Sequence, residues 1–120
     1  SMETVKLSKS YTVNGTTFDT VELREPTYKD IYMDGLGKPF EWQTTPNGPV
    51  LLKLATVVDS YLQRLIKAPG YEFIHGLNAA DSDRLEQAVI GFFTGAGKSS
   101  TGSATSSSST SDGQPPKSSD

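Results

Sequence analysis

The chain has 120 residues and a formal net charge of −3, from 11 basic and 14 acidic side chains. This length favours one small domain, and the acidic balance argues against a dedicated nucleic-acid binder, which would carry a basic face. Because cysteine is absent, disulfides and thiolate chemistry are excluded. No apolar run approaches the ~20 residues that cross a bilayer, and no signal peptide is visible, so we expect neither a membrane protein nor an exported one.

Residues 98–120 differ in composition from the rest of the chain. Serine supplies 10 of these 23 residues, and Ala104 is the only apolar one. Such a segment buries too little apolar area to offset the entropy of ordering it, so we predict a disordered tail. Residues 1–97 then form the single folded domain. For this domain we predict an α+β fold, with an N-terminal β-hairpin followed by a small bundle of three to four helices.

The N-terminal hairpin is predicted from two strands around Asn14-Gly15. Residues 3–13 alternate apolar and polar side chains, as half-buried strands do, and Asn-Gly is the strongest short hairpin signal. Uninterrupted pairing would put the apolar residues of the two strands on opposite faces. We therefore predict a β-bulge near Asp19-Thr20 that brings Leu23 opposite Leu7. The shared apolar face then holds Val5, Leu7, Tyr11, Phe18, Val21 and Leu23.

The segment after the hairpin carries helix-start and loop signals. Thr27 and Asp30 have the spacing of a capping box, which predicts a short helix over residues 28–34 with Ile31 pointing inward. Residues 36–48 have loop composition but contain two large aromatic side chains, Phe40 and Trp42. Aromatic side chains in a loop either plug the edge of a core or form an exposed contact for a partner, and both readings stay open here.

Two longer helices are predicted in the second half of the domain. Residues 49–67 place apolar side chains at spacings of three and four, with Pro49 suited to the first turn. Residues 79–94 follow Asn78, a good N-cap, with Asp81 and Asp83 favourable near the positive helix end. The nine apolar positions of the first helix exceed what a small hairpin covers, so the excess packs on the last helix or on another subunit. These apolar faces comprise Val50, Leu51, Leu54, Val57, Val58, Tyr61, Leu62, Leu65 and Ile66, and Leu85, Ala88, Val89, Phe92 and Phe93.

The search for catalytic and cofactor motifs is nearly empty. Residues 95–99 look like the end of a phosphate-binding loop, but Phe92 stands where that motif needs glycine. Glu72 and His75, within a predicted single helical turn over 71–76, have a metal-ligand spacing, yet one such pair supplies only two ligands. We therefore predict no metal, no cofactor and no enzymatic activity.

Three stretches of the sequence resemble a known family. They are ETVKLSKSYTVNGTTFDTVELREPTYKDI, LLKLATVVDSYLQRLI and YEFIHGLNAADSDRLEQAVIGFF, and together they span residues 3–94. In order and pattern they are similar to the phage tail assembly chaperones of Mu-like and P2-like contractile-tailed phages, the small tail assembly protein E group. The loop at 36–48 and the serine-rich tail depart from that pattern.

This resemblance implies a non-enzymatic protein that binds the phage tape-measure protein and keeps it soluble while the tail is assembled in the cytoplasm of the bacterial host. It also implies the tail tube protein as a candidate partner, and a longer form made by ribosomal frameshifting in some members. The surplus apolar helix surface makes further copies of the chain candidate partners as well. The alternative function is a structural or adaptor component of the tail particle. From the apolar helix faces we expect the partner to contact Leu51, Leu54, Val58, Tyr61, Leu65, Phe92 and Phe93.

Overall fold

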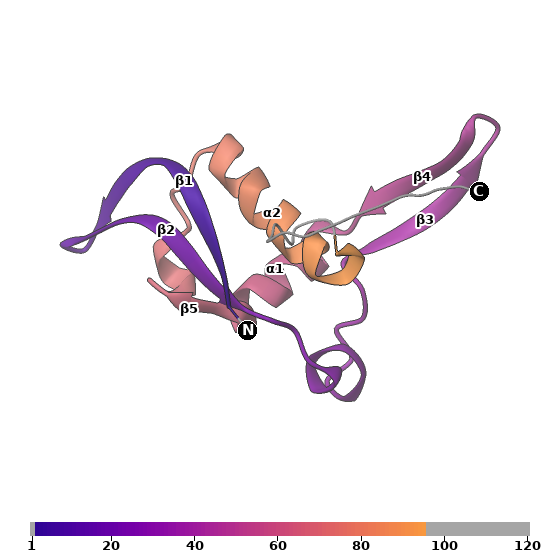
Figure 1. Ribbon diagram of the computed structural model, residues 1–120, viewed down its shortest axis with the longest axis horizontal. Helices are drawn as coiled ribbons and strands as arrows, with labels where there is room; N and C mark the ends of the chain where they lie inside the picture. Colours follow the sequence, from indigo (N-terminus) through magenta and orange to yellow (C-terminus); the bar gives the residue numbers. More distant parts are fainter. Residues whose placement is uncertain (1, 96–120) are drawn as a thin grey trace, which may run out of the picture.

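The computed structural model describes residues 2–95 as an α+β fold (Figure 1). Strands β1 (Met2–Val13), β2 (Thr16–Arg24) and β5 (Ile66–Ala68) form an antiparallel sheet in the order β1-β2-β5. Helices α1 (Ala55–Leu65) and α2 (Ala79–Thr94) pack on one face of this sheet. A second sheet contains only β3 (Phe40–Thr45) and β4 (Gly48–Lys53). The elements are completed by a π-helical turn, η1 (Lys29–Met33), and a 3-10 turn, η2 (Tyr71–Phe73).

The core lies between the first sheet and the two helices. The predicted apolar face of the N-terminal hairpin is confirmed, because its aliphatic members are buried and its two aromatic members pack beside them. Leu85 and Val89 of α2 meet this face, as the helical pattern predicts. The buried apolar residues are Val5, Leu7, Val21, Leu23, Val58, Tyr61, Leu62, Leu65, Leu85, Val89 and Ile90.

The hairpin turn is confirmed, but the irregularity in the sheet lies on the other strand. Asn14 and Gly15 both have positive φ, as the turn requires. Beyond the Tyr11–Phe18 pair, however, the register shifts because residues 7–10 of β1 face only Asp19. The predicted bulge near Asp19-Thr20 of β2 is therefore wrong, and Leu23 pairs with Glu3 rather than with Leu7.

A buried carboxylate explains why β1 leaves the regular ladder at this point. Asp81 in the first turn of α2 accepts hydrogen bonds from the Ser8 backbone N–H at 2.8 Å and the Ser8 hydroxyl at 2.9 Å. It also accepts one from the Tyr11 hydroxyl at 2.7 Å. The backbone of β1 therefore turns toward the helix, and the Asp81 carboxylate is completely buried.

The segment predicted as a loop and the start of the long helix form the β3–β4 hairpin. Residues 36–48 contain β3, and β4 pairs Pro49 with Thr44, so Pro49 does not open a helix. The predicted helix over 49–67 begins only at Ala55 and ends at Leu65, after which the chain pairs with β2. With two α-helices and two short turns in the described residues, the predicted bundle of three to four helices is not fully matched.

The short elements follow the sequence signals more closely. Thr27 and Asp30 exchange hydrogen bonds, from Thr27 N–H to Asp30 Oδ2 at 2.8 Å and from Asp30 N–H to Thr27 Oγ1 at 3.5 Å, as a capping box requires. Ile31 packs against the core. Asn78 caps α2 by accepting the Asp81 N–H at 2.8 Å, and Gly95 ends that helix at positive φ. The predicted tail over 98–120 lies outside the described residues, as do residues 96–99 of the segment that looks like a phosphate-binding loop.

Candidate partner-binding surface

Exposed apolar side chains form two groups, one at Tyr28, Tyr32 and Met33 around η1 and one on the β3–β4 hairpin. The hairpin projects from the body (Figure 1). Trp42 is 63% exposed, Val50 40% and Leu52 38%. A single exposed apolar residue is ordinary, but a group on one projecting element marks an interaction surface. Of the two alternatives for the aromatic residues of this segment, a plug at the edge of the core or an exposed contact, the exposure of Trp42 fits the second.

The strand register distributes these side chains over both faces of the hairpin. Trp42 pairs with Leu51, and Gln43 pairs with Val50. Because side chains alternate along a strand, Trp42 and Leu51 share one face with Phe40, while Val50 and Leu52 share the other. Neither face of the hairpin is polar throughout, so a partner could gain apolar contact from either side.

Two contacts fasten the base of the hairpin to α2, and one hydrogen bond joins its two ends. The Phe40 ring packs edge-to-face on Phe93 of α2, with centroids 6.3 Å apart. Lys53 Nζ lies 3.5 Å from Glu86 Oε1 of the same helix. The Leu54 N–H donates to the Pro39 carbonyl at 2.9 Å. Phe40 thus packs on Phe93, which itself lies against the core, so of the two aromatics it is the one nearer to the first alternative. These contacts hold the hairpin at its root.

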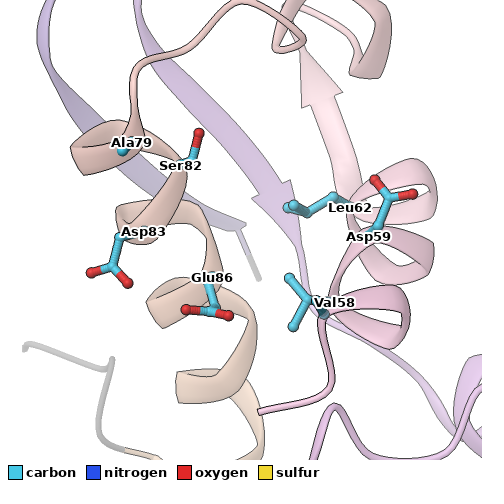
Figure 2. A pocket seen from close by; sticks show the side chains of 8 residues that line it. Val58, Asp59, Leu62, Ala79, Ser82, Asp83 and Glu86 are labelled. Carbon is cyan, nitrogen blue, oxygen red and sulfur yellow. The ribbon is translucent and has the colours of Figure 1, made fainter.

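A hollow of about 400 Å³ opens between α1 and α2 near this root (Figure 2). Figure 2 shows Val58 and Leu62 projecting from α1 toward α2, where they form an apolar floor. Carboxylates border the hollow from both helices, namely Asp59, Asp83 and Glu86. An apolar floor with an acidic border suits the apolar face of a helix that carries basic residues alongside.

The two buried carboxylates serve the fold rather than this surface. Hydrogen bonds from Arg24, the first at 2.9 Å, hold the pKa of Asp30 far below its usual range, against the opposing effect of burial. Arg64 of α1 also bonds Asp30, at 3.2 Å. For Asp81, burial raises the pKa, but hydrogen bonds from Tyr11 and Ser8 outweigh it and leave the pKa lowered. Both carboxylates tie the sheet to a helix.

The residues expected to contact a partner fall into two groups. Val58, Tyr61 and Leu65 are buried inside this chain. Leu51, Leu54, Phe92 and Phe93 are half-buried, and of these Leu51 lies on the hairpin. Sequence reasoning missed Val50 and Leu52 as surface residues, because it placed them on a helix. A period-two reading of residues 48–53 after Asn47-Gly48 would have found them.

Glu72 and His75 are the candidate metal-ligand pair of the sequence. His75 packs edge-to-face on Tyr71, with ring centroids 5.1 Å apart. Within residues 2–95, no group of three or more His, Cys, Asp or Glu side chains could hold a metal ion. None of the helices in that range is long and apolar enough to cross a membrane.

The described residues thus form a small α+β protein with an exposed apolar hairpin. The sequence model of the family of phage tail assembly chaperone proteins, E, or 41 or 14, matches residues 4–94. The chain therefore belongs to this family, as the resemblance in its sequence indicated. No curated protein and no solved structure matches it.

Proposed function

We propose that this chain binds the tape-measure protein of its phage and keeps it soluble until the tail tube assembles around it. Membership of the tail assembly chaperone family supports a role among tail proteins. The observation that carries the finer proposal is the apolar surface of the β3–β4 hairpin, formed by Trp42, Val50, Leu51 and Leu52 beside the hollow between α1 and α2. The action is non-enzymatic and takes place in the cytoplasm of the bacterial host.

The proposed mechanism is shielding of apolar surface. A long helical tape-measure protein exposes apolar side chains before the tube covers them, and such surfaces associate in water. The exposed side chains of the β3–β4 hairpin meet one apolar helix face, and the hollow between α1 and α2 extends the contact. The carboxylates of Asp83 and Glu86 favour segments with basic side chains next to the apolar stripe. The tail tube protein is a further candidate partner when it replaces this chain on the tape-measure protein.

Co-expression with the tape-measure protein of the same phage tests this proposal. We expect the chain to raise the soluble yield of the tape-measure protein, and the double variant Val50→Glu, Leu52→Glu to lose most of that effect. The matched control is Tyr32→Glu, Met33→Glu, which alters two apolar residues that are also exposed but lie on η1. An unchanged yield with the intact chain, or equal losses in both double variants, contradicts the proposal.

A structural or adaptor role in the tail particle is the second candidate. It is favoured by the two-stranded sheet, because strands without neighbours can pair with strands of other subunits. Mass spectrometry of purified phage particles separates the two functions. A chaperone is absent from finished tails, whereas a structural component is present in stoichiometric amount.

A further inference from the structure

Among residues 2–95, no strand pairs with the outer edge of β3. In an antiparallel pair, residues alternate between those that bond their partner strand and those whose N–H and C=O point outward. Two observations fix this alternation in the β3–β4 pair. Leu54 N–H bonds the Pro39 carbonyl, so the next pair, Phe40 with Lys53, is of the outward kind.

The second observation is the position of Pro49. Proline has no N–H, and the Thr44–Pro49 pair has the same parity as the Phe40–Lys53 pair, so both belong to the outward kind. The outward groups of β3 are consequently those of Phe40, Trp42 and Thr44. On β4 the corresponding edge contains Pro49, which cannot donate and blocks a regular ladder.

The other long edge strand is not open in this way. Residues 7–10 of β1 leave the regular register, and the Ser8 N–H is donated to Asp81. Among the strands of residues 2–95, β3 is therefore the best template for adding a strand. A two-stranded hairpin is only marginally stable in water by itself. Pairing of β3 with a further strand would therefore stabilise it.

We propose that the β3 edge pairs with the β3 edge of a second copy of this chain, antiparallel and about a two-fold axis at Trp42. In this register Trp42 lies opposite Trp42 of the second copy, and Phe40 lies opposite Thr44, so every outward group of β3 is bonded. The result is a four-stranded sheet. Because Pro49 blocks both of its new edges, the assembly closes as a dimer.

Two features favour this register over the two adjacent registers, a charge repulsion in one and a missing N–H in the other. Centred on Trp42, the strands place Glu41 opposite Gln43 of the second copy. Moving the two-fold axis from Trp42 to Glu41 brings the two Glu41 carboxylates face to face, which is unfavourable for like charges directly opposite on a sheet. Moving the axis to Gln43 instead puts Phe40 opposite Pro46, which has no N–H. In the Trp42-centred register a second copy of β3 therefore bonds every outward group without opposing like charges.

The first test measures association of the full chain by sedimentation velocity from micromolar to millimolar concentration. We expect a monomer–dimer equilibrium, and a blue shift of the fluorescence of Trp42, the only tryptophan, as dimer forms. Thr44→Pro removes one outward donor from each copy without touching the β3–β4 ladder, and should weaken the dimer at least tenfold. Thr44→Val keeps that donor and should dimerise normally. A chain that stays monomeric throughout this range overturns the proposal, as does equal dimerisation by the two variants.

The second test does not depend on proline being tolerated. Gln43→Lys places a cation opposite Glu41 of the other copy twice per dimer, and should tighten association by roughly threefold to tenfold at low salt. Gln43→Glu should weaken it by a similar factor. Tightening by both or by neither contradicts the Trp42-centred register. Since all readouts use the chain alone, this inference stands or falls separately from tape-measure binding.

Discussion

The β1–β2 and β3–β4 hairpins both have two-residue turns, Asn14-Gly15 in the first and Pro46-Asn47, followed by Gly48, in the second, yet their surroundings differ completely. The first has one face covered by α1 and α2 and gains β5 as a third strand. The second remains two-stranded and exposes apolar side chains on both faces. Local turn chemistry therefore explains the shape of both hairpins, whereas burial explains why only one of them is part of the core.

The same substitution in each hairpin should give the largest contrast. Leu23→Ala empties a completely buried site in β2 and should lower the free energy of unfolding by about 2–5 kcal/mol. Leu52→Ala removes a side chain that is 38% exposed in β4 and should cost less than about 1 kcal/mol. Urea denaturation followed by circular dichroism measures both. Equal losses would mean that the β3–β4 hairpin is as deeply packed as the first.

The attachment of the first hairpin to α2 depends on the Asp81 carboxylate. In Asp81→Asn the amide nitrogen cannot accept from Ser8 or Tyr11, and Arg84 loses its anionic partner at 2.8 Å. We expect a lower denaturation midpoint, with a smaller loss than in Leu23→Ala. Asp83→Asn is the matched control, because Asp83 is also near the start of α2 but is exposed. If the control loses as much stability, the effect comes from the helix dipole and not from the bonds to β1.

The sequence alone located the first hairpin correctly and the second not at all. Val5, Leu7, Val21 and Leu23 alternate with polar residues, so their common face follows from the pattern. Val50, Leu51 and Leu54 have spacings that fit a helix equally well, and the continuous apolar run into α1 concealed the strand. The Asn47-Gly48 dipeptide was the available signal. The pattern predicted a register change beside Asp19, but which strand carries the extra residues could not be predicted, because that depends on Asp81, far away in sequence.

The candidate surface was likewise only half visible in the sequence. For Trp42 the sequence left two alternatives open, a plug at the edge of the core and an exposed contact, and only the structure shows that it is exposed. Val58, Tyr61 and Leu65 fit a docking stripe and a core stripe equally well, since both require apolar side chains at helical spacing. Only the packing of α1 against the sheet distinguishes them, and it places all three in the interior.

Acid should loosen the body before it affects the second hairpin. The pKa values of Asp30 and Asp81 are lowered in the folded chain, whereas an unfolded Asp titrates at about 3.9. Their stabilisation is therefore fully present above about pH 5 and is lost progressively as the pH falls below 4 toward the folded-state values. Denaturation midpoints measured from pH 7 to pH 2 should fall in this window. Asp30→Asn should flatten the fall, and an unchanged slope in that variant would contradict the assignment.

The smallest effect concerns the root of the second hairpin, where Lys53 meets Glu86 at 3.5 Å. Because both side chains are partly exposed, Lys53→Gln should cost at most about 1 kcal/mol of global stability. Its local effect should be greater, since this contact and the Phe40–Phe93 packing are what fix the hairpin to α2. Hydrogen exchange of the β3–β4 amides should accelerate in Lys53→Gln while the amides of β1 and β2 remain protected. Lys29→Gln, which removes an exposed ion pair on η1, should leave both sets unchanged. Faster exchange throughout the chain would show instead that the two hairpins unfold as one unit.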